Sequence, residues 1–174
     1  MTEWCEMKGR RDYGMDSALR TTREIMDDLV WGGVSSWQYW IAVSRYNFRD
    51  GLIYVNESER EILPTKRLWS MGNFSRFIRP GFRRFDVEHN STVLYVVAFK
   101  SLDGSKIVVV VMNPGTESEE VELHCTNGTE VNILDIFETS ATNDLKAMSH
   151  GMPNNMYSFP AESVTTLVIK GSGE

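Results

Sequence analysis

The 174-residue sequence has few cysteines, no long apolar run and no excess of positive charge. Its two cysteines, Cys5 and Cys125, could form at most one disulfide and lack metal-ligand spacing, so neither a disulfide framework nor a metal site is expected. No segment approaches the roughly 18 apolar residues that a membrane-spanning helix needs. The net charge of −6 offers no cationic surface, which argues against nucleic acid and anionic membranes as partners.

Signals for secretion are also sparse. The opening residues, MTEWCEMKGRRDYG, become charged within three positions and contain no apolar core, so they do not have the pattern of a signal peptide. Four N-x-S/T triplets hint at a secreted lineage, although one of them falls in a segment that we expect to be buried. The four asparagines are Asn56, Asn73, Asn90 and Asn127.

Aromatic residues are concentrated in residues 34–52, VSSWQYWIAVSRYNFRDGL. If residues 34–43 form a strand, both of its faces carry apolar or aromatic side chains, as in the covered strands of parallel α/β sheets. The following loop is rich in hydrogen-bonding groups and lies at the end of the strand where parallel barrels place their sites. The alternative is a buried strand with aromatic side chains as packing. The loop residues are Ser44, Arg45, Tyr46, Asn47, Arg49 and Asp50.

A helical pattern precedes residues 34–52, and a mixture of strand and helix patterns follows them. Residues 14–30 have apolar side chains at helical spacing and are closed by Gly32-Gly33, which predicts a helix in a βαβ unit. One such unit cannot cover a parallel sheet, so we expect the tail of an α/β architecture. A short strand is expected at 52–55, a polar connection at 56–64, and a helix at 66–78 that ends in the turn 79–81.

From residue 82 onward the sequence predicts β structure. Short apolar runs alternate with turn signals such as Asp103-Gly104, which is typical of an antiparallel sandwich. The polar stretch 139–155 is expected to be a loop or to contain a short helix. The predicted strands are residues 82–87, 93–99, 106–112, 119–125, 131–137, 157–159 and 164–170.

Three segments together resemble the C-terminal part of glycoside hydrolase family 30, which includes glucosylceramidases and endo-β-1,6-galactanases. They are MTEW at the start, SSWQYWIA at 35–42 and LWSMGNFSRFIRPG at 68–81, and AESVTTLV at 161–168 is similar to the last strand of that family's side domain. The interval from MTEW to SSWQYW is most similar to the endo-β-1,6-galactanase branch. The resemblance implies an α+β fragment, the last βαβ portion of a TIM barrel followed by an antiparallel β-sandwich side domain. The corresponding domains are residues 1–51 for the barrel piece, 52–81 for a connecting strand and helix, and 82–174 for the sandwich.

By this resemblance the chain is the C-terminal portion of a retaining β-glycosidase that acts on a β-linked oligo- or polysaccharide, with an endo-β-1,6-galactanase favoured. Glu3 matches the nucleophile, Trp40 matches the aromatic floor under the cleaved sugar, and Tyr46 is a second candidate for substrate binding. No metal or cofactor is implied, and the parent family is extracellular. The chain alone is expected to be inactive, because the acid/base carboxylate of the family lies on a strand in the missing barrel portion.

The remaining ionisable residues are expected to be structural. Glu6, Asp12 and Asp50 are interpreted as solvated charges of loops or helix starts. His89, His124 and His150 have no spacing that supports a triad or a metal site. The alternative to the enzyme is a non-catalytic β-sandwich module, either carbohydrate-associated or a structural support.

Overall fold

The computed structural model describes residues 1, 3–126, 128, 130–149 and 155–173. The chain divides into two compact units, Met1–Met71 and Gly72–Glu174, and each is described by itself. The division falls inside helix α2 (Lys66–Ser75). Among the described residues, none of the helices combines the length and the apolar character that a membrane span requires.

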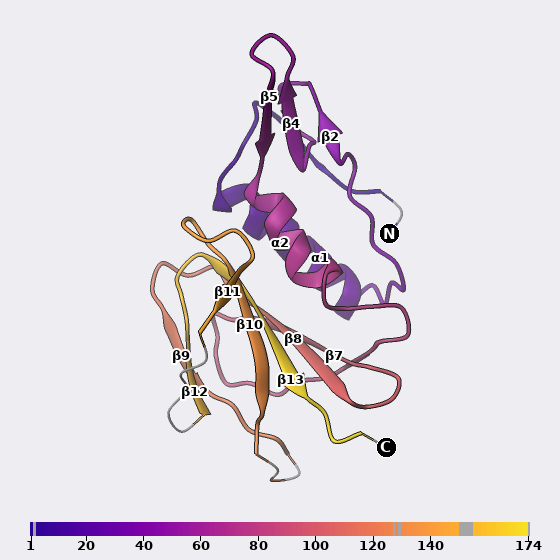
Figure 1. The fold of residues 1–174 in the computed structure, drawn as a ribbon, viewed down its shortest axis with the longest axis vertical. Coiled ribbons are helices and arrows are strands. Elements are labelled where there is room, and N and C mark those ends of the chain that lie inside the picture. The colour runs from indigo at the N-terminus through magenta and orange to yellow at the C-terminus, as the bar shows by residue number, and fades with distance from the viewer. Residues whose placement is uncertain (2, 127, 129, 150–154, 174) are drawn as a thin grey trace. The chain divides into compact units, whose positions relative to one another are not determined.

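The first unit contains one long helix and several short strands (Figure 1). β2 pairs in parallel with β4, β4 pairs antiparallel with β5, and β1 pairs antiparallel with β3. The elements are β1 (Glu6–Gly9), α1 (Met15–Val30), β2 (Val43–Ser44), β3 (Phe48–Arg49), β4 (Ile53–Asn56) and β5 (Glu61–Pro64), followed by the start of α2.

Helix α1 forms where the sequence predicts it. Met15, Ala18, Ile25 and Met26 recur at helical spacing and are all buried, so one side of the helix faces the interior. Small hydroxyl residues extend this buried side, and Thr21 satisfies its hydroxyl by donating to the carbonyl oxygen of Ser17 at 2.9 Å. The helix packs through a mixed apolar and hydroxyl surface.

Residues 34–43 do not form the covered strand that the sequence predicts. Their ladder is reduced to an isolated parallel bridge between Trp4 and Tyr39 and to the two-residue strand β2. A continuous strand needs main-chain partners along its length, and in the described residues the segment around Trp4 supplies them at one point only. The expectation of two covered faces is also wrong, because Trp40 is 50% exposed and Ile41 is 36% exposed.

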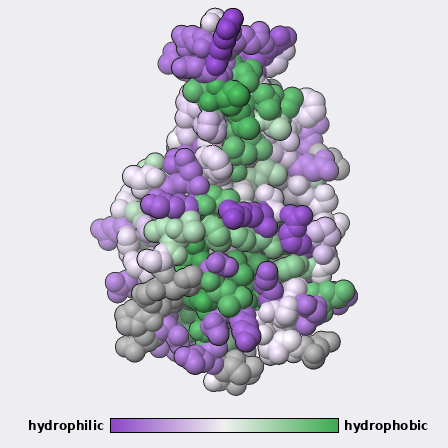
Figure 2. All heavy atoms as spheres, in the orientation of Figure 1, coloured by the Kyte–Doolittle hydropathy of each residue, from purple (hydrophilic) through white to green (hydrophobic). Residues whose placement is uncertain are grey.

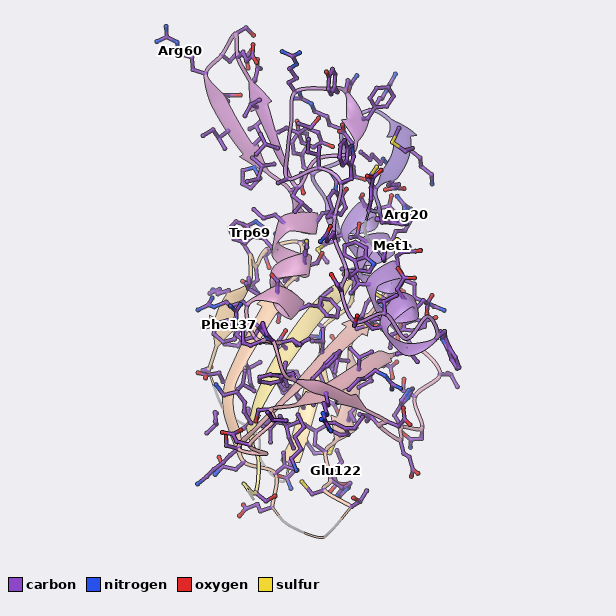
Figure 3. The ribbon with its side chains drawn as sticks, turned by 90° about the vertical axis from the view of Figure 1, so that its right-hand side faces the viewer. Met1, Arg20, Arg60, Trp69, Glu122 and Phe137 are labelled. Carbon is purple, nitrogen blue, oxygen red and sulfur yellow. The ribbon has the colours of Figure 1, made fainter. Side chains whose placement is uncertain are left out.

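The polar connection predicted at 56–64 contains strand β5, so β4 and β5 form a hairpin with Tyr54 opposite Leu63. The turn is acidic and polar, and Figure 2 shows hydrophilic side chains gathered over it. Arg60 has a positive φ of 56° at this turn, and its side chain points away from the hairpin (Figure 3). The apolar run of β5 is only Ile62 and Leu63, which is too short to distinguish a strand from a connection.

The second unit is an antiparallel β structure (Figure 1). A six-stranded sheet has the order β11-β10-β13-β8-β7-β6, and β12 pairs with β9 in a separate two-stranded sheet. The strands are β6 (Arg83–Phe85), β7 (Tyr95–Lys100), β8 (Lys106–Asn113), β9 (Glu119–Glu122), β10 (Ile133–Thr139), β11 (Lys146–Met148), β12 (Met156–Phe159) and β13 (Ser163–Lys170). Strand β11 lies inside the stretch 139–155 that the sequence assigns to a loop or a short helix, and it pairs with β10.

The core of this unit lies between the two sheets. Phe159 of β12 belongs to the same buried cluster as Val111 of β8, Ile136 of β10 and Leu167 of β13. Val121 of β9 packs against that cluster while Glu122 is exposed, which is the alternation of one buried and one wet face that the sequence predicts. The α+β class with an antiparallel β-sandwich is therefore confirmed.

Candidate functional site

Glu3 and Trp40 lie on two neighbouring segments joined by main-chain hydrogen bonds. The N–H of Trp4 donates to the carbonyl oxygen of Gln38 at 3.2 Å, and the N–H of Trp40 donates to the carbonyl oxygen of Trp4 at 2.9 Å. Because successive side chains of an extended segment alternate in direction, Trp4 and Tyr39 share one face of this bridge. Glu3, Cys5 and Trp40 project on the other face.

The face that carries Trp4 is an aromatic cluster. The ring centroids of Trp4, Trp37 and Tyr39 are 6.0–6.3 Å apart. The indole N–H of Trp37 donates to Oδ2 of Asp28 at 2.8 Å, and the Tyr39 hydroxyl donates to the carbonyl oxygen of Arg49 at 3.0 Å. Burial raises the pKa of Tyr39 well above its ordinary value, so this phenol stays protonated. Trp37 and Tyr39 are packing residues that fix the bridge.

Cys5 lies on the same face as Glu3 and is a free thiol. Burial raises the pKa of the Cys5 thiol, and the negative charges of Asp50 and Glu3 raise it further. The thiol is therefore protonated at neutral pH and is a poor nucleophile. Glu3 itself is exposed at the surface of the unit.

Trp40 and Tyr46 line the same pocket, which has a volume of about 280 Å³. Half of the Trp40 side chain and 56% of the Tyr46 side chain are exposed, so an indole and a phenol ring are available to a ligand. Aromatic faces of this kind stack on the C–H faces of sugars. The other lining residues are Ile41, Val43, Ser44, Arg45, Asp50, Val55 and Glu57.

The wall of the pocket that carries Tyr46 is held by hydrogen bonds to its main chain. The N–H of Tyr46 donates to Oγ of Ser44 at 3.1 Å, and the Ser44 hydroxyl donates to Oδ2 of Asp50 at 3.0 Å. Arg11, which precedes this segment by more than 30 positions in the sequence, donates to the carbonyl oxygens of Arg45 and Tyr46. The main chain around Tyr46 is thus tied at both its N–H and its C=O.

The interpretation of Glu6 and Asp50 as solvated charges is wrong. Glu6 is 7% exposed and Asp50 is 8% exposed. Glu6 accepts a hydrogen bond from the Ser17 hydroxyl at 2.7 Å, and its Oε1 lies 2.7 Å from Nε of Arg20. A buried carboxylate requires such partners, and β1 and α1 supply them once they are packed together.

Asp12 is only 15% exposed, so it too is not a solvated charge, although it does lie at a helix start. Its Oδ1 accepts the N–H of Gly14 at 2.7 Å, just before α1 begins at Met15, and its Oδ2 lies 3.5 Å from Nη1 of Arg49. These two contacts tie the entry of α1 to strand β3.

The buried residue Arg67 was not predicted to have a role, yet it connects α2 to α1 and β4. It is fully buried and donates to the Ser17 hydroxyl at 2.6 Å, to the Gly51 carbonyl oxygen at 2.7 Å and to the Tyr54 hydroxyl at 2.9 Å. The Ser17 hydroxyl in turn donates to Glu6, so Arg67, Ser17 and Glu6 form one hydrogen-bond network within the first unit. No local sequence pattern identifies it.

The other candidates are not brought together by the structure. Within the part of the chain that is described, no group of three or more His, Cys, Asp or Glu side chains could hold a metal ion. His124 lies 3.3 Å from the exposed Glu122, and the Nδ1 of His89 lies 3.1 Å from the carbonyl oxygen of Ser91. Asn73 is fully buried, as expected. His150 and Asn127 lie outside the described residues.

Comparison with protein families gives one match in the N-terminal part of the chain and one in the C-terminal part. The model of the O-glycosyl hydrolase family 30 matches residues 3–54, and the model of the glycosyl hydrolase family 30 β-sandwich domain matches residues 83–167. The first match contains Glu3, Trp40 and Tyr46, and the second contains most strands of the sandwich.

Curated and solved relatives agree with these matches. A glucuronoxylanase of Bacillus subtilis is 29% identical over 161 residues, which are 88% of this chain and 34% of the relative. The solved family 30 subfamily 8 xylanase of Clostridium acetobutylicum is 26% identical, with a TM-score of 0.77 over 98% of this chain and 42% of that chain. A solved conserved exported protein of Bacteroides fragilis is 26% identical, with a TM-score of 0.75 over 96% of this chain and 38% of that chain. The chain thus spans about a third of the length of the curated relative.

Proposed function

The chain belongs to glycoside hydrolase family 30 and corresponds to its C-terminal part, and we propose that it completes the active site of a retaining β-glycosidase. In this proposal Glu3 is the carboxylate that attacks the anomeric carbon, and Trp40 and Tyr46 bind the sugar. A second carboxyl group, supplied by the barrel strands that this chain does not contain, protonates the leaving oxygen. Retaining enzymes place these two groups about 5–5.5 Å apart.

The observation that carries the proposal is the parallel bridge beside the pocket. It puts Glu3 and Trp40 on one face of two adjacent segments, and Trp40 forms part of a pocket that also holds Tyr46. A nucleophile next to an exposed indole is the arrangement needed to hold a sugar ring while its anomeric carbon is attacked. The buried Glu6 and the buried Asp50 are engaged with Ser17 and Ser44, whereas Glu3 is exposed. Glu57 is the exposed carboxylate among the residues that line the pocket itself.

The substrate class of the proposal is a β-linked polysaccharide. The curated relative is a glucuronoxylanase and one solved relative is a xylanase, which supports a xylan backbone. The interval between Glu3 and Trp40 resembles the endo-β-1,6-galactanase branch, which supports a β-1,6-linked galactan. The exported relative supports an extracellular location, where such polysaccharides are found.

The test is an assay of the enzyme with a complete barrel, in which these residues are joined to barrel strands of a family 30 relative. We expect glucuronoxylan or β-1,6-galactan to be cleaved with retention of configuration, and Glu3→Gln to abolish cleavage. The 174-residue chain without those strands should not turn over an aryl β-glycoside, because loss of general acid catalysis alone costs about 10²–10⁴ in rate. Cleavage that survives Glu3→Gln would refute the assignment of the nucleophile.

A further inference from the structure

One arginine side chain holds three main-chain carbonyl groups of the first unit. In Arg11, Nε donates to the carbonyl oxygen of Tyr46 at 2.9 Å, and Nη2 donates to that of Arg45 at 2.7 Å and to that of Val55 at 3.4 Å. The main-chain N–H of Arg11 also donates to Oδ1 of Asn47 at 3.1 Å. A residue that precedes α1 therefore contacts every residue of 45–47, which we term the pocket loop.

The guanidinium is oriented by an aromatic ring. Its central carbon lies 4.6 Å from the centroid of the Tyr54 ring, and Tyr54 is fully buried. The Tyr54 hydroxyl is itself held, since it accepts from Arg67 at 2.9 Å and donates to the carbonyl oxygen of Phe48. A planar guanidinium can stack on a ring and donate in several directions within its plane, and an ammonium group cannot do both.

The pocket loop has little else to fix its conformation. Arg45, Tyr46 and Asn47 are all exposed, so burial of their side chains contributes little to ordering them. Their other main-chain contacts in the described residues are the N–H of Tyr46 on Ser44 and the carbonyl oxygen of Asn47, which accepts the N–H of Arg10 at 2.9 Å. The conformation of this loop decides where the Arg45 and Tyr46 side chains stand on the pocket wall.

We infer that Arg11 is a positioning residue of the sugar-binding site: it makes no contact with the ligand and holds the pocket loop so that Tyr46 and Arg45 line the pocket together with Trp40. The inference rests on the proposed function only for the identity of the ligand. The conformational part, that the guanidinium orders residues 45–47, holds whatever the pocket binds. Arg11→Lys keeps the positive charge but removes the planar set of N–H donors of the guanidinium. Arg11→Ala removes the whole group and leaves a space against the Tyr54 ring.

The first test measures amide hydrogen exchange in the unsubstituted chain, in Arg11→Lys and in Arg10→Gln. Arg10 is the matched control, because in the part of the chain that the structure describes its side chain makes no hydrogen bond or ion pair. We expect Arg11→Lys to raise exchange at the amide of Tyr46, which donates to Ser44, by about tenfold, with exchange in α1 and in strands β7 to β13 unchanged. Arg10→Gln should not change exchange in the pocket loop. Equal exchange in Arg11→Lys and in the unsubstituted chain would overturn the inference.

The second test measures binding of xylohexaose and of a β-1,6-linked galactohexaose through tryptophan fluorescence. We expect Arg11→Ala to weaken the binding of the preferred hexasaccharide by about tenfold, and millimolar guanidinium ion to restore much of it by occupying the space on Tyr54. A general loss of stability would not be restored by guanidinium, which is a denaturant. Unchanged affinity in Arg11→Ala would overturn the inference. If the unsubstituted chain binds neither sugar while exchange responds to Arg11→Lys, the proposed sugar site fails and the positioning of the loop stands.

Discussion

The N–H of Trp40 donates to the carbonyl oxygen of Trp4, 2.9 Å away. Since Trp4 follows Glu3 directly in the chain, this hydrogen bond sets the position of Glu3 relative to Trp40 through the main chain. The aromatic contacts of Trp4 with Trp37 and Tyr39 support it from the opposite face. Side-chain substitutions of Glu3 and Trp40 should therefore leave the bridge intact, and their effects on function can be compared directly.

Glu3→Ala in the enzyme with a complete barrel is expected to abolish nearly all turnover and to leave sugar binding measurable. The substitution removes the group that attacks the anomeric carbon and empties the space opposite the leaving group. Added azide can enter that space, so it should restore part of the turnover and give a product of inverted configuration. Product stereochemistry is the measurement, and an inverted product from the unsubstituted enzyme would contradict a covalent role for Glu3.

Trp40→Ala is expected to fail in a different way. Loss of a stacking surface costs roughly 1–3 kcal/mol, which corresponds to a decrease of about tenfold to a hundredfold in kcat/KM, and azide should not restore it. Trp31→Ala is the matched control, because Trp31 is 84% exposed and does not line the pocket. Steady-state kinetics of the two variants are the measurement. Near-normal kinetics of Trp40→Ala would contradict a role for Trp40 in substrate binding.

The elements that the sequence predicts correctly are those that carry their own periodicity. The buried side of α1 and the short apolar runs at β8 and β13 are each visible within one segment, and the structure forms a helix and two strands at those places. Residues 34–43 show the limit of this reasoning. Their aromatic side chains do sort onto two faces, but the ladder that would make them one strand depends on partners elsewhere in the fold. Among the described residues, Tyr39 pairs with Trp4 and Val43 pairs with Ile53, so the pairing is divided between two separate segments.

The polar network could not be predicted because its partners are far apart in the sequence. Hydrogen-bonded partners are separated in the sequence by 11 positions for Glu6 and Ser17, by 35 for Arg11 and Tyr46, and by 50 for Arg67 and Ser17. A charged residue read by itself is most simply placed at the surface. Only the packing of α1 against β1 and α2 shows that these charges are internal. The identities of Glu3, Trp40 and Tyr46 as candidates came from a resemblance, and their roles stay predictions.

Arg67→Met is expected to destabilise the first unit by about 3 kcal/mol or more. The substitution leaves the buried Gly51 carbonyl oxygen without its donor and breaks the connection to Ser17, and each buried polar group without a partner costs about 1–3 kcal/mol. Arg60→Met at the exposed β4–β5 turn is the matched control and should change stability little. Denaturant unfolding, followed by the fluorescence of the tryptophans in the first unit, measures both. A change below about 0.5 kcal/mol in Arg67→Met would contradict the structural role.

Glu6 is expected to make the first unit sensitive to acid. Burial by itself raises the pKa of Glu6, but the hydrogen bond from Ser17 and the positive charges of Arg20 and Arg49 outweigh burial and hold the pKa below its ordinary value. A carboxyl group with a lowered pKa in the folded state stabilises the fold above its unfolded pKa of about 4.3, and this contribution is lost as the pH falls through the folded value.

Glu6→Gln should therefore lower stability at pH 7 and should differ less and less from the unsubstituted chain as the pH falls below about 4. Unfolding free energies measured over this pH range give the result. Glu61→Gln, on the exposed side of β5, provides a control of equal charge change. A stability difference between Glu6→Gln and the unsubstituted chain that stays constant from pH 7 to acid would exclude the linkage.

Asn73 is expected to hold the end of α2 to the sheet of the second unit. Its Nδ2 donates to Oγ1 of Thr166 at 2.9 Å, its Oδ1 accepts the Thr139 hydroxyl at 2.7 Å, and its carbonyl oxygen accepts the Thr166 hydroxyl at 2.8 Å. All three residues are fully buried. Asn73→Ala leaves the Thr139 hydroxyl without its acceptor and the Thr166 oxygen without its donor, so a loss of about 2–4 kcal/mol is expected. Ser75→Ala, on an exposed position of the same helix, is the control.

The resemblance to family 30 implies that the sandwich domain begins at residue 82, and hydrogen exchange in these two variants also tests whether the folding unit begins there. If strands β8 and β13 fold without α2, Asn73→Ala should leave their protection unchanged and lower only the protection of residues 72–78. If the end of α2 is part of the unit, Asn73→Ala should lower protection throughout β10, β13 and β8, because Thr139 and Thr166 belong to adjacent strands of one sheet. The hydrogen bonds of Asn73 favour the second outcome. Unchanged protection in β13 of Asn73→Ala would put the boundary back at residue 82.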